Sequence, residues 1–287
     1  MNEQHRSVVV IGLPGSGKTT FLAALWHLVS GRELNTRLSF DKLLSGDATY
    51  LNSIAERWRS GKEQDRTFLN GNQLVSINLK DQNDSSLQVT FPDIAGEEFC
   101  QMWEARECDN NVAGFIKEGG VLLFVHADKI IAPQWVVDLT AMSKKLGLDI
   151  PDGQPIPWHP RYAPTQVQIV GLLSLLRKAP LDTGPRRVAV MLSAWDKAKD
   201  EQLTPDAFLE AKLPLLNQYL QQEADGWEWR IYGVSAQGDD YDKPDTKSPS
   251  AKTEALLDLD YPSTRIQLVS AQSQSHDLTE PLEWLIN

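Results

Sequence analysis

The 287-residue chain is predicted to fold as a three-layer α/β protein, with helices on both faces of a mostly parallel sheet. Short apolar runs alternate with amphipathic helical stretches along almost the whole chain, which is typical of successive strand–helix units. Residues 121–125 and 188–192 are continuously apolar, as parallel strands buried on both faces are. One hairpin is expected to add a single antiparallel strand at an edge of the sheet.

The N-terminal part is predicted to hold one strand and two helices. Residues 7–12 form a β-branched run that ends in glycine, which indicates a buried strand. Residues 18–29 place their large apolar side chains on one helical face. Asp47 is expected to cap the second helix, because the apolar positions from Leu51 to Trp58 follow the i, i+3, i+4 and i+7 spacing.

The hairpin comes next. Residues 73–79 and 87–91 alternate strictly between apolar and polar side chains, as half-buried strands do, and polar turn residues join them. One helix is predicted over 98–117, ahead of the strand at 121–125. Residues 129–164 lose this periodicity and are rich in proline, so they are expected to form a surface insertion with a short helix at 135–146.

The C-terminal half continues the alternation of strands and helices. Thr165 is expected to cap a helix through Lys178, and Thr204 to begin a long helix to about Ala224. Residues 237–275 are polar and turn-rich, and they are expected to form a second surface insertion. The other predicted elements are three strands and a closing helix, at 188–192, 229–234, 265–269 and 277–285.

Composition limits the classes of function. The chain is 41% hydrophobic and 23% charged, and its formal net charge is -11. This acidity argues against binding to a nucleic-acid backbone or to an anionic membrane surface. No apolar run approaches the ~18 residues that a membrane span needs. The polar N-terminus has no signal-peptide core, and the two cysteines match no disulfide framework, so a cytoplasmic location is expected.

Residues 12–20 read GLPGSGKTT and satisfy the pattern G-x-x-x-x-G-K-[ST] between a predicted strand and a predicted helix. Glycines let the backbone approach a polyphosphate closely, and the amides of the loop and of the helix start then point at its oxygens. The Lys18 ammonium is expected to reach the terminal phosphates, and the Thr19 hydroxyl to ligate Mg²⁺. The residues expected to contact the nucleotide here are Gly12, Pro14, Gly15, Ser16, Gly17, Lys18, Thr19 and Thr20.

Two further features point to a nucleotide whose γ-phosphate is sensed. Asp93 ends the second hairpin strand, where a carboxylate can support Mg²⁺ through water, and Gly96 can bring its backbone N–H against a γ-phosphate. Thr67 lies in the polar segment ahead of the hairpin. GTPases keep there the threonine that closes over Mg²⁺, and an ordinary loop threonine is the alternative.

A third set of residues is a candidate reader of the base. Asp196, in SAWD after a buried strand, can accept hydrogen bonds from the guanine N1–H and 2-amino group, which adenine does not offer. Ser235 and Ala236 follow the next strand and could present a backbone N–H to the guanine O6, with Ser270-Ala271 as the alternative. Trp195 and Lys197 are candidates to cover the base.

The series GLPGSGKT, Thr67, DIAG, SAWD and SA resembles a Ras-like GTPase of the TRAFAC class. With LAALWHL after the loop and DLTEPLEWLI at the end, the chain is similar to the bacterial double-GTPase family, whose members occur in predicted conflict and defence systems. The resemblance implies a single Ras-like domain over 1–287, with surface insertions at about 129–164 and 237–275.

The chain departs from this family pattern at two points. Ser193 and Ala194 stand where GTPases of the class usually carry Asn-Lys. Glu97 stands where many relatives have a glutamine that orients the attacking water. A carboxylate near an anionic γ-phosphate is disfavoured unless Mg²⁺, Lys18 or a partner arginine compensates, so slow hydrolysis is expected. The alternative is that Glu97 faces solvent or caps the next helix.

The sequence therefore predicts a Mg²⁺-dependent GTP-binding switch with slow, partner-stimulated hydrolysis, whose catalytic residues are Lys18, Thr67, Gly96 and Glu97. Thr19, Thr67 and Asp93 are the expected metal site. The expected partners are GTP or GDP and an activating, effector or neighbouring protein, with a homodimer left open. Two alternatives remain at this point, a nucleotide-binding assembly subunit without turnover and a P-loop ATPase or kinase.

Overall fold

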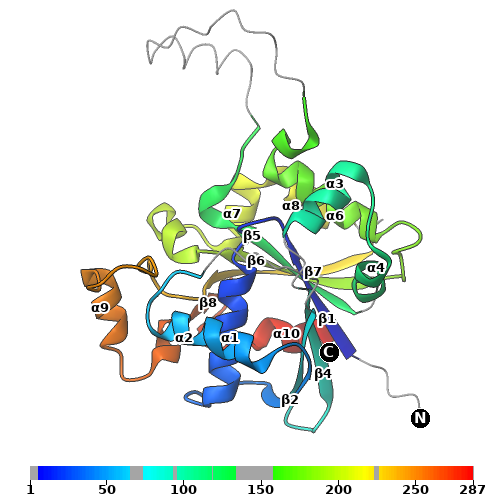
Figure 1. The fold of residues 1–287 in the computed structure, drawn as a ribbon. Helices are drawn as coiled ribbons and strands as arrows, with labels where there is room; N and C mark the ends of the chain where they lie inside the picture. The colour runs from blue at the N-terminus through cyan, green and yellow to red at the C-terminus, as the bar shows by residue number, and fades with distance from the viewer. Residues whose placement is uncertain are drawn as a thin grey trace, which may run out of the picture.

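A computed structural model describes residues 6–64, 74–92, 96–117, 119–133, 158–222 and 226–286. Nine strands of these residues form one mixed sheet in the order β2-β3-β4-β1-β5-β6-β7-β8-β9. The α/β prediction is confirmed, and helices cover both faces of the sheet (Figure 1). None of the helices within these ranges is long and apolar enough to span a membrane.

The centre of the sheet is parallel, as predicted. Its strands are β4 (Ser86–Pro92), β1 (Arg6–Gly12), β5 (Gly120–His126), β6 (Arg186–Ser193) and β7 (Trp227–Ser235). Each neighbouring pair in this series runs parallel. The carboxyl ends of β1, β5, β6 and β7 consequently meet at one edge, which is where ligands bind in open α/β sheets.

Both margins of the sheet are antiparallel, so the prediction of a single antiparallel edge strand was wrong. β3 (Leu74–Lys80) pairs with β4 as the expected hairpin, and β2 (Ser39–Ser45) then adds outside β3. At the other margin, β8 (Gln267–Val269) and β9 (Gln274–Ser275) continue from β7. β2 is mostly exposed and lacks an apolar alternation, which is why its sequence did not indicate a strand.

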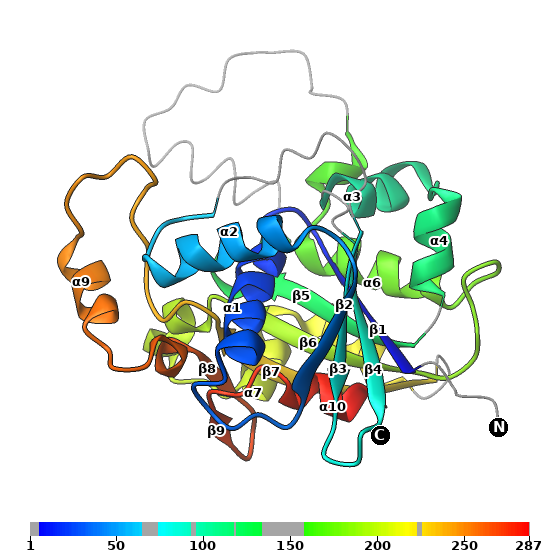
Figure 2. The ribbon, with the colours of Figure 1, turned by 60° about the horizontal axis from the view of Figure 1, so that its bottom comes forward.

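The strand period of two divides the apolar core between the two faces. In β1, Val8 and Val10 face one cluster, whereas Val9 and Ile11 face the other. The first cluster lies under α1 (Lys18–Gly31), α2 (Ala48–Arg59) and α10 (Glu280–Ile286). Figure 2 shows α1 and α2 on this face, where they pack against each other. α2 thus adds a second helix to the layer next to α1.

The second cluster lies under the helices of the opposite face. Two long helices predicted on this face are each divided into two shorter ones. One helix was predicted over 98–117, but α3 (Gly96–Ala105) and α4 (Asn110–Ile116) are separate. Arg106 has φ 60°, which ends α3, and the Asp109 carboxylate accepts from the Val112 N–H at the start of α4. Pro214 likewise divides the predicted long helix into α7 (Pro205–Lys212) and α8 (Pro214–Leu220).

The other helices sit close to their predicted positions, with two corrections. Thr204 caps α7 as predicted, whereas Thr165 is the first residue of α6 (Thr165–Leu176) and its hydroxyl instead accepts from the Ile131 N–H at 2.9 Å. The tail contains α9 (Ala251–Leu257), which was not predicted. Short 3₁₀ turns complete the described chain at Ala127–Lys129, Pro160–Tyr162, Trp195–Glu201 and Pro262–Arg265. The helix predicted at 135–146 lies outside the described residues.

Candidate nucleotide-binding site

The glycine-rich loop lies between the end of β1 and the start of α1, in the predicted context. A Cβ at Gly12 would come within 2.7 Å of the Phe124 carbonyl oxygen, so only glycine fits this close approach. Gly17 has φ 87°, and a Cβ there would lie 3.0 Å from the Ser193 side chain. Both glycines are therefore required by the shape of the loop itself.

The Lys18 ammonium lies inside the loop. Its Nζ donates to the carbonyl oxygens of Gly12 at 2.7 Å and Leu13 at 3.0 Å, and to the Ser16 hydroxyl at 3.3 Å. The positive charge is thus held at the centre of the curved backbone rather than in solvent. A polyphosphate in the loop would meet this charge directly.

The start of α1 has no side-chain cap and no acidic residue in its first turn. Asp47, Thr204 and Ser250 cap α2, α7 and α9 with their side chains, whereas Gly17 at the same position of α1 offers none. Backbone N–H groups at a helix start carry a partial positive charge, and an anion can be their partner when no side chain takes that place.

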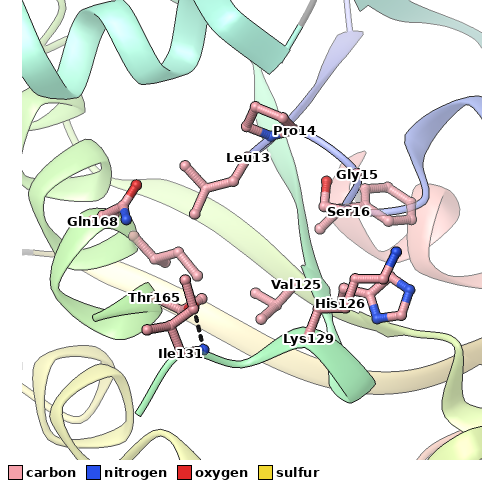
Figure 3. A pocket seen from close by; sticks show the side chains of 12 residues that line it. Leu13, Pro14, Gly15, Ser16, Val125, His126, Lys129, Ile131, Thr165 and Gln168 are labelled. Carbon is pink, nitrogen blue, oxygen red and sulfur yellow. Dashed lines mark hydrogen bonds between the residues drawn. The ribbon is translucent and has the colours of Figure 1, made fainter. Parts of the chain in front are cut away.

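A cavity of about 180 Å³ lies beside the loop (Figure 3). Leu13 to Ser16 form one wall, the end of β5 forms the floor, and Ile131, Thr165 and Gln168 close the opposite side. His126 lines it too, and burial lowers the pKa of that imidazole to about 4, so the ring is neutral at pH 7. The volume of the cavity is below the roughly 300 Å³ of small-molecule pockets, so the cavity suits a small group rather than a whole nucleotide.

The end of β6 is hydrogen-bonded to the phosphate loop. The Ser193 hydroxyl is buried and donates to the Ser16 carbonyl oxygen at 2.8 Å. The sequence analysis treated Ser193 only as a departure from the family pattern and missed this contact. The available signal was its place at the end of the buried strand 188–192. One hydrogen bond thus joins the two segments that were predicted to hold the phosphates and the base.

Asp196 and Ser235 come together from adjacent loops. The Ser235 hydroxyl is fully buried, and it donates to Asp196 Oδ1 at 2.6 Å and accepts from the Gly238 N–H at 3.1 Å. The Ser270 backbone N–H donates instead to the Ser273 carbonyl within its own turn. Of the two Ser-Ala pairs, the structure therefore brings Ser235-Ala236 to Asp196.

The two candidates to cover the base lie in different surroundings. Trp195 is only 5% exposed and packs against Gly233 and Phe208, so it belongs to the core and cannot cover a base. Lys197 is exposed, and its Nζ lies 2.7 Å from Asp240 Oδ1. This hydrogen bond raises the pKa of Lys197 and holds the ammonium at the rim of the site.

The comparison with protein families identifies the family of this chain. The family model described as Double-GTPase 1 matches residues 9–285. The chain belongs to the Double-GTPase 1 family. No curated protein matches the chain significantly.

Solved structures similar to this double-GTPase chain include GTP-binding proteins. The GTPase-like domain of Ski7 from S. cerevisiae, bound to GTP, is 12% identical with a TM-score of 0.37, and the match covers 88% of this chain and 49% of that one. The SRb-GTP/SRX complex of the signal recognition particle receptor from Chaetomium thermophilum is 14% identical with a TM-score of 0.37, covering 82% and 93%. These likenesses are loose, and the family assignment comes from the family model.

Several predicted residues of the double-GTPase chain lie outside the described residues, namely Thr67, Asp93 and the side chain of Glu97. Gly96 is the first residue of α3, and Thr19 is the second residue of α1, next to Lys18. The Thr19 hydroxyl has the hard oxygen that Mg²⁺ prefers, and phosphate oxygens and water usually supply its other ligands. Thr19 thus fits a magnesium site that would neutralise phosphate charge.

Proposed function

We propose that this protein binds GTP with Mg²⁺ and hydrolyses it slowly, as a switch whose state a partner protein reads. The observation that carries the proposal is the hydrogen bond from Ser193 to the Ser16 carbonyl. It joins the phosphate loop to the end of β6, shortly before Asp196, so the loop and Asp196 would hold the triphosphate and the guanine of one ligand. Family membership supports the same reading.

The proposed roles come from the sequence motifs together with the contacts of the described residues. The amides of residues 12–17 and the Lys18 ammonium would cradle the phosphates, and Thr19 would hold Mg²⁺ together with Thr67 and Asp93. Gly96 would sense the γ-phosphate beside Glu97. Asp196 would accept from the guanine N1–H and 2-amino group, while Ala236 would donate its backbone N–H to the O6. Lys197 would lie at the rim of the base site.

The intrinsic tryptophan signal offers a direct test of binding. Titrations with GTP, GDP and ATP, each with and without Mg²⁺, should show guanine nucleotides binding at least tenfold more tightly than ATP. Equal affinities for GTP and ATP would contradict guanine recognition and favour the ATPase or kinase alternative.

Hydrolysis requires a separate measurement. Multiple-turnover assays on the purified protein should give a rate below about 0.01 s⁻¹, in the range of unaided GTPase switches. A rate on the order of 1 s⁻¹ would contradict a partner-dependent switch. Tight binding with no product, even beside a partner, would instead identify an assembly subunit without turnover. A bacterial defence setting is part of the proposal on the family resemblance alone.

A further inference from the structure

A buried indole from α2 is bonded to the loop that follows β7. Trp58 is fully buried, and its Nε1–H donates to the Ala236 carbonyl oxygen at 2.7 Å, across 178 residues of sequence. Ala236 follows Ser235 directly, and the Ser235 hydroxyl donates to Asp196. Trp58 therefore holds the backbone of the loop at the residue next to the one that contacts Asp196, the carboxylate proposed to read the base.

The indole ring is itself contacted by two side chains, Arg265 and His27. The Arg265 guanidinium lies 4.6 Å from the ring centroid, and its Nη1 donates to the Trp58 carbonyl at 3.0 Å and to the Tyr241 hydroxyl at 3.0 Å. The His27 ring lies 4.8 Å away, from α1. Arg265 is only 3% exposed, so these contacts are shielded from water and hold the ring in one orientation.

A second contact joins the same two regions. The Asp242 N–H donates to the Gly61 carbonyl at 3.0 Å, and the Glu63 N–H donates to the Asp242 carbonyl at 2.8 Å. Gly61 and Glu63 follow α2 directly, while Asp242 lies a few residues after Ala236. The chain beyond β7 is therefore anchored to the end of α2 on both sides of residues 237–241.

We propose that Trp58 is a positioning residue for guanine recognition. Its N–H holds the Ala236 carbonyl and so fixes the residue whose backbone N–H, in the preceding peptide unit, would meet the guanine O6. The inference rests on the proposed function and adds a residue to it. A loop that has lost this anchor samples other conformations, and the apparent affinity falls in proportion to the fraction that stays competent. The effect should be confined to ligands that carry a 6-oxo group.

Trp58→Phe tests the proposal, since it keeps an aromatic ring and removes the N–H. Calorimetric titration should show GTP and inosine triphosphate, which both carry the 6-oxo group, binding 3- to 10-fold more weakly than to the wild type. MgATP and magnesium tripolyphosphate, which lack it, should change less than twofold. Trp26→Phe is the matched control, because the Trp26 indole donates to Asn52 at 2.9 Å, from α1 to α2, and this hydrogen bond involves no residue of the proposed base site.

The outcomes separate the inference from the function on which it rests. Unchanged GTP affinity in Trp58→Phe, or an equal loss for tripolyphosphate, would overturn the positioning role while leaving GTP binding intact. A wild type that does not prefer GTP over ATP would overturn the proposed function, and the inference with it. If the variant does not fold, replacing the Trp58 indole with the benzothiophene ring of benzothienylalanine removes only the N–H donor, and the same titrations then decide.

Discussion

The two ends of the candidate site are built in different ways. At the phosphate end, Lys18 contacts Gly12, Leu13 and Ser16, all within six positions along the chain. At the base end, the contacts join residues 39 to 178 positions apart, as Ser235 with Asp196 and Trp58 with Ala236 show. A short motif can specify these Lys18 contacts, whereas the contacts at the base end depend on how distant strands and helices pack.

Loss of the Lys18 side chain should weaken phosphate binding, and this is the largest of the expected effects. In Lys18→Ala the loop loses the charge at its centre, so GTP affinity should fall at least 100-fold, equivalent to about 3 kcal/mol or more. Thermal unfolding without nucleotide should change little, because Lys18 is only partly buried. Calorimetric titration measures the affinity, with Lys129→Ala at the rim of the adjacent cavity as the control. Nearly unchanged affinity in Lys18→Ala would contradict phosphate binding by this loop.

Asp196→Asn tests whether this carboxylate reads the base. An amide offers an N–H where the carboxylate accepted from guanine, so GTP affinity should fall roughly 10- to 100-fold while xanthosine triphosphate binds more tightly, since each 1.4 kcal/mol is tenfold. The Ser235 hydroxyl can still donate to the Asn oxygen, so the fold should be retained. Competition between the two nucleotides measures the change in preference. If guanine binding is untouched, Asp196 does not read the base.

The same contrast explains what the sequence could predict of this protein. The strand 7–12, the glycine loop, the helix after it and the Asp47 cap follow from local pattern, and all of them are confirmed. β2 could not be predicted, because an exposed edge strand carries no apolar alternation. The breaks at Asp109 and Pro214 had local signals, a possible helix cap and a proline, but each prediction ran one helix across them.

The candidate site shows a similar division. Its residue types and their order were readable from the motifs. The hydrogen bond from Ser193 to Ser16 was not, because it depends on the registers of β5 with both β1 and β6. Trp58 was readable only as a core residue of an amphipathic helix. Its partner Ala236 is brought near by the packing of α2 at the sheet, which no local pattern encodes.

Gly17 lies where the two ends touch, so its substitution tests their junction. Gly17→Ala places a Cβ 3.0 Å from the Ser193 side chain at a φ of 87°, which should destabilise the fold by about 1–3 kcal/mol and weaken GTP binding as well. Chemical denaturation gives the free energy of unfolding. Gly114→Ala in α4 is the matched control, since a Cβ there meets nothing within 4 Å, and it should stabilise by about 0.5–1 kcal/mol. Equal effects of the two changes would show that the junction carries no strain.

His126, which lines the cavity beside the phosphate loop, should make the stability of the fold depend on pH. This is the smallest of the expected effects. The pKa of this imidazole is lowered from 6.5 to about 4, mainly by burial, with a smaller lowering by the charges of Lys129 and Lys197 that Asp128 opposes. The unfolded chain therefore takes up a proton before the folded one does, so the stability present above pH 6.5 is lost as the pH falls toward 4. His126→Asn keeps an acceptor for the Asp128 N–H and removes the titration. The free energy of unfolding of the wild type should fall by about 1 kcal/mol more than that of the variant between pH 7 and pH 5, after allowance for solvent screening. Some pH dependence should persist in the variant, because burial also lowers the pKa of His27. If the free energies of unfolding of the two proteins fall equally between pH 7 and pH 5, His126 is not held neutral beside the loop.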